Sequence, residues 1–357
     1  MARHRLPHGQ LFERHDAELR VFLYSHGAED FSAIRQRLMA AGDHFVEARE
    51  LSSRVLAERI RADGIDILVD LKGYTLDARP AVFAHRPAPV QVAYLGFPGT
   101  SGASCIDYIV GDAHVTPLDH APLFTEKIAQ LPLCYQCNDG TRRLPVAPSR
   151  ASQGLPDDAL VLCAFNQPYK ISPEVFDVWC RLLHRLPSAV LWLLAWTPQA
   201  PPALRREAEA RGIDPSRLVF ADTVGQEQHL DRVACADIFL DTWPCNGHTT
   251  ASDMLWAAVP VVTYSGRTFA SRVAGSLLKA LDMPELVCDS VEAYEALIYA
   301  LGTDCARRSE LQRRVVAARM TSPLFSSARL APQLEDLFQR MWARALVGLP
   351  PDHLPAA

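Results

Sequence analysis

Small and polar residues gather in one stretch, "DTWPCNGHTTASDMLWAA", which runs from residue 241 to residue 258. The apolar run "ADIFLDT" before it predicts a buried strand, and "TASDMLWAA" predicts a helix. A helix that begins near Thr249 or Thr250 presents unpaired backbone amides and the positive end of its dipole. Gly247 removes a side chain where an anion would approach, and His248 adds a donor. This junction therefore suits a phosphate group.

The same stretch has a plainer interpretation. Threonine often caps a helix, so Thr249 or Thr250 could serve only that purpose while His248 packs inside the protein. Asp253 falls in the first helical turn, where its carboxylate could accept hydrogen bonds from sugar hydroxyls. The local pattern alone leaves both interpretations open.

A second polar loop, "CAFNQPYKIS", starts where another apolar strand stops. Asn166, Gln167 and Lys170 therefore lie at the carboxyl end of that strand, where ligands of parallel sheets bind. A lysine there can neutralise a diphosphate as a mobile point charge. The alternative is a solvated loop lysine.

The segment "ADTVGQEQHLDRV" follows the strand "RLVF". His229 and Arg232 are three residues apart, so they share one face of the expected helix. An imidazole can stack on a base and a guanidinium can donate to a base carbonyl. A surface helix with scattered charges is the alternative.

A fourth loop, "AYLGFPGTSGASCIDYIVGD", carries glycines and a proline after a strand. It matches neither the G-x-G-x-x-G fingerprint nor the P-loop. Its backbone could approach a sugar, or the loop could be a plain turn.

Strands and helices alternate through the sequence, which predicts α/β lobes with parallel sheets. The Pro-, Gly- and Ser-rich segment 138–158 marks the joint between two lobes. We therefore expect an N-terminal lobe over 1–148, a C-terminal lobe over 149–330, and a terminal helix and tail over 331–357. Pro332 suits the first turn of that helix. Its apolar face would consist of Leu334, Leu337, Phe338, Met341, Trp342 and Ala345.

Composition excludes several classes of protein. The net charge of −5 argues against a general nucleic-acid binder, and no apolar run reaches the length of a membrane span. The N-terminus lacks the apolar core of a signal peptide, and nine scattered cysteines suit a reduced, cytoplasmic setting. "CYQC" (134–137) has no second pair, and no metal-binding cluster or D-x-D motif follows a strand. If a nucleoside diphosphate leaves here, cationic and helix-terminal groups must stabilise it.

Together these segments resemble the catalytic region of the protein O-GlcNAc transferases, glycosyltransferase family 41, which includes bacterial SPINDLY-like proteins. The similar stretches occur in the family's order and cover nearly the whole chain. They are "RPAPVQVAYLGFPGTSGASCIDYIVGD", "FNQPYKISPEVFDVWCRLLHRLPSAVLWLL", "EQHLDRVACADIFLDTWPCNGHTTASDMLWAAVPVVT" and "GRTFASRVAGSLL". The resemblance implies a GT-B fold of two facing Rossmann-like lobes. It also implies inverting transfer of a sugar, GlcNAc by analogy, from a UDP-sugar to Ser or Thr hydroxyls of proteins, without a metal or cofactor.

The resemblance also implies roles for single residues. Lys170 and His248 would be catalytic, with Lys170 stabilising the departing UDP. Binding of the UDP-sugar would fall to Gln167, Thr249 and Thr250 at the phosphates, Asp253 at the ribose, His229, Arg232 and Val224 at the uracil, and Leu95, Gly96 and Cys245 at the donor sugar.

The sequence departs from the family pattern at several points. Gln226 stands where the family has a lysine near the ribose. The helical tetratricopeptide array that usually precedes the catalytic region is absent, so a partner chain could supply it. The match begins at "GQLFERHD", and His4 and His8 do not fall where the family places an active-site histidine. We therefore expect the first lobe to lack its N-terminal strand and that histidine, whether as a natural short form, a misplaced start or a gene remnant.

Three functional hypotheses follow. The first is a protein O-glycosyltransferase that uses a UDP-sugar. The second is a UDP-binding remnant or binding module without catalysis. The third is a GT-B enzyme with another donor, such as GDP-fucose, or with a non-protein acceptor.

Overall fold

The computed structural model describes residues 9–16, 18–29, 31–136 and 138–357, so His4, His8 and Cys137 lie outside the described residues. Contacts divide the chain into two compact units. The first comprises Met1–Thr141 with Pro323–Ala357, and the second comprises Arg142–Ser322. The terminal helix therefore belongs to the first unit, while the domain limits expected from composition stay predictions.

The second unit contains a parallel sheet of six strands in the order β12-β11-β10-β7-β8-β9. Its first strand, β7, lies centrally between β8 and β10, which is the order of a doubly wound nucleotide-binding sheet. Every residue of β7 is buried, as expected where helices cover both faces. The strands are β7 (Leu160–Ala164), β8 (Ala189–Leu194), β9 (Leu218–Ala221), β10 (Ile238–Leu240), β11 (Val261–Tyr264) and β12 (Val287–Cys288).

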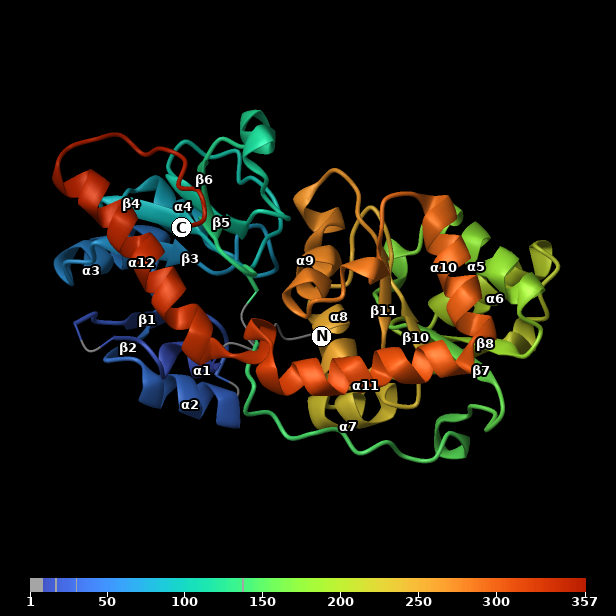
Figure 1. Cartoon of the computed structure of the whole chain (residues 1–357). Coiled ribbons are helices and arrows are strands. Elements are labelled where there is room, and N and C mark those ends of the chain that lie inside the picture. The colour runs from blue at the N-terminus through green and yellow to red at the C-terminus, as the bar shows by residue number, and fades with distance from the viewer. Residues whose placement is uncertain (1–8, 17, 30, 137) are drawn as a thin grey trace. The chain divides into compact units, whose positions relative to one another are not determined.

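Helices cover this sheet, and Figure 1 shows α9 and α10 on opposite sides of β11, against which both pack. Local sequence explains their bounds: Ser172 accepts the amide of Val175 at the start of α5, and Pro173 occupies its first position. The helices are α5 (Pro173–Arg185), α6 (Ala200–Ala210), α7 (Gln226–Val233), α8 (Thr249–Trp256), α9 (Val273–Ala280), α10 (Val291–Thr303) and α11 (Cys305–Thr321).

The first unit contains two separate parallel sheets. Four strands form one sheet in sequence order: β3 (Ile67–Asp70), β4 (Val90–Ala93), β5 (Tyr108–Asp112) and β6 (Lys127–Leu131). Strands β1 (Phe22–Ser25) and β2 (His44–Glu47) form the other. The helices of this unit are α1 (Gly9–Phe12), α2 (Ala33–Ala41), α3 (Ser53–Ala62), α4 (Pro80–Ala84) and α12 (Ser327–Leu346).

The strand connections differ between the two units. In the second unit, β7 joins the pair β8–β9 to the strands β10–β12. In the first unit, no strand among the described residues joins β1 to β3. The expectation that the first lobe lacks its N-terminal strand stays a prediction.

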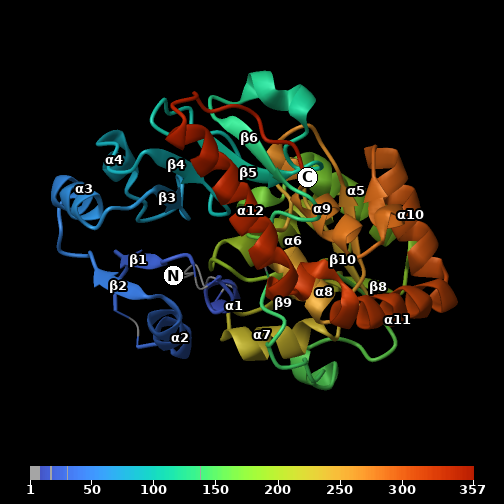
Figure 2. The ribbon, with the colours of Figure 1, turned by 60° about the vertical axis from the view of Figure 1, so that its left-hand side comes forward.

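Helix α12 begins earlier than expected. It starts at Ser327, so Pro332 lies inside the helix, and the prediction that Pro332 occupies the first turn was wrong. Buried Leu330 and Ala331 extend the apolar face toward the N-terminus, which accounts for the earlier start. The helix packs against β6 and β4, and both views show it lying along that sheet (Figures 1 and 2).

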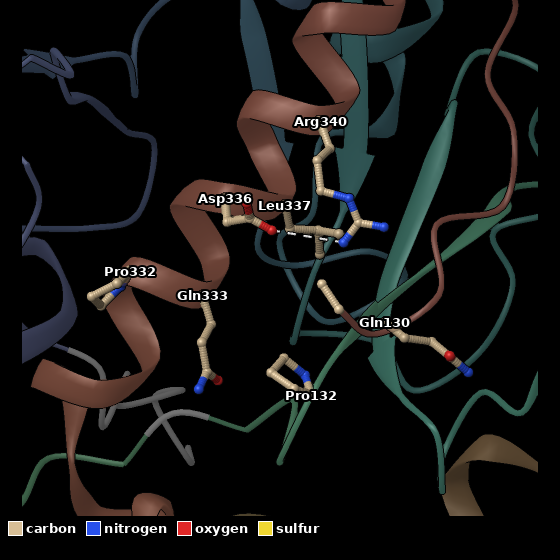
Figure 3. Close-up of a pocket in the computed structure, with 8 residues that line it drawn as sticks. Gln130, Pro132, Pro332, Gln333, Asp336, Leu337 and Arg340 are labelled. Atoms are coloured by element: carbon tan, nitrogen blue, oxygen red, sulfur yellow. Dashed lines mark ion pairs between the residues drawn. The ribbon is translucent and has the colours of Figure 1, made fainter.

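A pocket of about 210 Å³ lies between α12 and the end of β6, and it opens to solvent (Figure 3). Its walls are Gln130, Pro132, Pro332, Gln333, Asp336, Leu337, Arg340 and Ala357. None of the candidate site residues lines it. Among the described residues, no helix combines the length and apolar character that a membrane crossing requires.

Candidate functional site

The candidate residues of the second unit follow the carboxyl ends of three strands. Gln167 and Lys170 follow β7, where Pro168–Lys170 form a short 3-10 turn. Residues 224–232 follow β9 on the approach to α7 and on α7 itself, and residues 245–253 follow β10 around the start of α8. Strands β7 and β10 are neighbours at the point where strand order reverses, so their loops flank the crevice that ligands of such sheets use.

Helix α8 presents an uncapped N-terminus. Its N-cap residue is His248, whose side chain makes no capping hydrogen bond. Thr249 and Thr250 are the first two helical residues, so they do not cap the helix, and their hydroxyls bond no described residue. Free amides, two hydroxyls and the helix dipole therefore coincide at one point, as an anion site requires.

Lys170 lies against the turn that leads into α8. Its Nζ donates to the carbonyl oxygen of Asn246 at 2.6 Å. The structure therefore brings together a cation and a helix N-terminus that are more than 70 residues apart in the sequence. Lys170 carries a positive charge and the start of α8 carries the positive end of a helix dipole, so both would attract a phosphate group.

His248 is neutral at physiological pH. Burial, together with the charge of nearby Lys170, lowers the pKa of its imidazole to about 3. Its Nε2 lies 3.5 Å from the carbonyl oxygen of Ala270. A neutral His248 keeps one N–H donor, and the expectation that it donates to a phosphate stays a prediction.

His229 and Arg232 contact each other on α7, as their spacing predicts. The Nη2 of Arg232 lies 3.4 Å from the Nδ1 of His229, and its guanidinium lies over the ring of Phe165. Burial, and then the charge of Arg232, lowers the pKa of His229 to about 4, so its ring is neutral. A neutral ring suits stacking on an uncharged base. Val224 is exposed, and it directly precedes Gly225, the N-cap residue of α7.

Asp253 has a partner that the sequence did not indicate. Its Oδ1 accepts from Nη1 of Arg142 at 2.8 Å; the side chain of Asp253 is buried, and that of Arg142 is 11% exposed. Burial raises the pKa of Asp253, and the Arg142 charge opposes that rise. Arg142 also lies over the ring of Trp256. Sequence reasoning assigned 138–158 to a linker, where no local signal distinguishes a structural arginine from a solvated one.

The sequence pattern did not indicate a role for Asp241, which opens the segment 241–258. Its side chain is fully buried and accepts hydrogen bonds from Thr242, Gly247 and Thr263. An acidic residue at a strand end just before a small-residue turn was the available signal. Cys245 lies half-buried in that turn, and Gln226 is the first residue of α7.

The loop after β4 in the first unit holds Leu95 and Gly96. Leu95 has a left-handed backbone with φ 75°. A Cβ on Gly96 would lie 2.2 Å from the carbonyl oxygen of Leu71, so only glycine fits against the loop after β3. Phe97 next to it meets Tyr74 edge to face. The loop therefore has a fixed shape that depends on its glycine.

Comparison with known proteins places these features in context. The model of glycosyl transferase family 41 matches residues 9–146 and 138–334. The chain is 39% identical over 360 residues to the Arabidopsis thaliana probable UDP-N-acetylglucosamine–peptide N-acetylglucosaminyltransferase SEC, a match covering 98% of this chain and 37% of that protein. A Caenorhabditis elegans UDP-N-acetylglucosamine–peptide N-acetylglucosaminyltransferase is 32% identical over 454 residues, covering 95% of this chain and 39% of that protein.

Among solved structures, a mutant of the Thermobaculum terrenum O-GlcNAc transferase superposes with a TM-score of 0.88 at 33% identity. That match covers 96% of this chain and 66% of that chain. The likeness confirms the predicted α/β fold of the GT-B type. The chain spans less than two thirds of the length of these relatives.

Proposed function

The chain belongs to glycosyl transferase family 41, and on that premise we propose that it transfers GlcNAc from UDP-GlcNAc to Ser or Thr hydroxyls of an acceptor protein or peptide. The observation that carries the proposal is the convergence of Lys170 with the uncapped N-terminus of α8. The named activity of the relatives supports the choice of donor and acceptor.

The reaction is a direct displacement with inversion at the anomeric carbon. The acceptor oxygen forms the new bond as the bond to the diphosphate breaks, UDP leaves with the electron pair, and the proton of the acceptor hydroxyl is released to solvent. Lys170 and the first-turn amides of α8 stabilise the charge that develops on the leaving oxygen. Thr249 and Thr250 add hydroxyl donors, and Gln167 lies one turn from Lys170.

The remaining candidate residues are assigned to the nucleotide and the sugar by resemblance to the family. Asp253, held by Arg142, has one oxygen left for a ribose hydroxyl. His229 would stack on the uracil, with Val224 and Arg232 near the base; the Nη2 of Arg232 lies 3.4 Å from the Nδ1 of His229. Cys245, Leu95 and Gly96 are assigned to the donor sugar by resemblance to the family. No residue is assigned as general base.

The proposal is tested by titrating the protein with UDP and GDP in a calorimeter, and by following transfer from UDP-GlcNAc to peptides by mass spectrometry. Binding of UDP with transfer of GlcNAc supports it. UDP binding without transfer favours a catalytically inactive binding module, and preference for GDP favours another donor.

The transfer is expected to be metal-independent, since Lys170 and α8 supply the positive charge that a metal would bring. Activity in excess EDTA should match activity in Mg²⁺ or Mn²⁺. A loss of activity in EDTA that a divalent cation restores would contradict this expectation.

A further inference from the structure

The Asp241 carboxylate anchors the turn before α8 at both ends. Its Oδ1 accepts from the backbone amides of Thr242 at 2.9 Å and Gly247 at 2.6 Å. Its Oδ2 accepts from the hydroxyl of Thr263 on β11 at 2.6 Å. One buried carboxylate thus joins the end of β10, the neighbouring strand and the residue that precedes His248.

The turn itself is closed by further hydrogen bonds. The hydroxyl of Thr242 donates to the carbonyl of Cys245 at 2.7 Å, and Nδ2 of Asn246 donates to the carbonyl of Thr242 at 2.8 Å. Asn166, at the end of β7, donates to the Thr242 hydroxyl at 2.9 Å. Because hydrogen bonds hold both ends and the middle of the turn, they fix its backbone conformation.

Lys170 depends on that shape. Its ammonium group donates to the Asn246 carbonyl, which lies inside the anchored turn. A displaced turn would therefore move both the cation and the first-turn amides of α8.

Burial of an acid in this place is costly for the fold. Asp241 is 0% exposed, and burial raises its pKa to about 6 despite its hydrogen bonds and nearby Lys170. An apolar residue would end β10 without that cost, whereas only an acceptor can hold the two amides.

We propose that Asp241 is a positioning residue that, by holding both ends of turn 242–247, places Lys170 and the α8 N-terminus for a nucleoside diphosphate. The inference rests on the proposed function of that site. It adds a residue that touches neither the diphosphate nor the sugar and acts through the turn.

Calorimetric titration of Asp241→Ala and Asp241→Asn with UDP and with uridine tests the role. Asparagine keeps an oxygen for the two amides, and Thr263 can accept from its NH₂, so UDP affinity should stay within about threefold of wild type. Alanine removes the anchor, so UDP affinity should fall about 100-fold while uridine affinity changes less than about threefold. Equal losses for UDP and uridine would overturn the proposal.

Asp237 provides a matched control at the start of the same strand. It accepts from the amide of Val161 at 2.7 Å and from Arg150 at 2.9 Å, so it also anchors the chain. Asp237→Ala should lower the melting temperature without changing the ratio of UDP to uridine affinity. A changed ratio would show that losing the hydrogen bonds of either aspartate beside β10 weakens UDP binding selectively. The effect would then not be specific to Asp241.

Hydrogen exchange at the amides of Thr242 and Gly247 gives a readout that does not need activity. Protection should persist in Asp241→Asn and fall in Asp241→Ala. Unchanged protection in Asp241→Ala would overturn the proposed role of Asp241 as an anchor.

If Asp241→Ala does not fold, Asp241→Glu, which displaces the carboxylate by one methylene, is titrated with UDP and uridine in its place. Wild type that fails to bind UDP refutes the proposed function, whereas wild type and Asp241→Ala that bind UDP equally refute only the role of Asp241.

Discussion

At the scale of single residues, Lys170 is the group whose loss should cost the most. Lys170→Met removes a charge that stabilises the leaving diphosphate, so kcat should fall by about 10² to 10³, or roughly 2–4 kcal/mol of barrier. Steady-state transfer assays measure the loss, and circular dichroism checks the fold. Lys279→Met, in the last turn of α9, is the matched lysine control and should keep wild-type rates. Wild-type turnover in Lys170→Met would remove the role of Lys170.

Thr249 and Thr250 separate phosphate recognition from base recognition. The double variant Thr249→Val, Thr250→Val keeps shape and removes two hydroxyls that bond no described residue. Because each hydroxyl bond to a charged group contributes about 1.5–3 kcal/mol, UDP affinity should fall at least tenfold. Uridine affinity, measured in the same calorimeter, should hardly change. Equal losses of UDP affinity and uridine affinity would show that the two hydroxyls do not contact the phosphates.

Residue types and spacing predicted which strand ends carry the candidate site residues. A lysine after one strand, and hydroxyls with a glycine after another, indicated an anion site because parallel strands end on one edge. Partners contributed by distant segments could not be predicted: Arg142 at Asp253, and the donors around Asp241, meet only in the folded chain. The protonation of His248 was equally hidden, since burial sets it.

At the scale of elements, the isolated pair β1–β2 has an open edge. The carbonyls of Val21 and Ser25 accept from β2, so the backbone groups of Phe22 and Tyr24 point to the other edge. That edge has no strand partner among the described residues.

Backbone exchange should reveal this edge. In residue-resolved hydrogen exchange, the amides of Phe22 and Tyr24 should exchange at least about tenfold faster than that of Leu162 in central β7. Leu23, on the same strand but facing β2, is the internal control. Slow exchange at Phe22 and Tyr24 would mean that another segment covers the edge in solution.

Periodicity predicted the type of each element, helix or strand, better than it predicted where the element begins and ends. The apolar strands and amphipathic helices of the second unit were predicted from their spacing, since buried strands and helix faces leave direct patterns. Pro332 misplaced the start of α12 because proline also tolerates positions beyond the first turn when packing favours the helix. Burial of Leu330 and Ala331, which decided the bound, depends on tertiary structure.

At the scale of the whole molecule, the free energy of unfolding depends on pH through the combined contributions of buried titratable groups. His229 and His248 have folded pKa values of about 4 and about 3, below the unfolded value of about 6.5. The unfolded chain therefore binds more protons below pH 6.5, and stability is lost as pH falls from there through the folded values. Asp241 acts in the opposite sense, since its folded pKa of about 6 exceeds the unfolded value of 3.8.

The free energy of unfolding should therefore decline between pH 6.5 and 4.5, by at most about 1.4 kcal/mol per pH unit for each histidine. Below pH 6, protonation of Asp241 offsets part of that decline. Urea unfolding across this range checks the slope. His229→Gln should flatten it, because glutamine fills a similar volume without titrating, whereas Asp241→Asn should steepen it by removing the group that gains a proton in the folded state. A slope that neither variant changes would show that these buried groups do not govern acid unfolding.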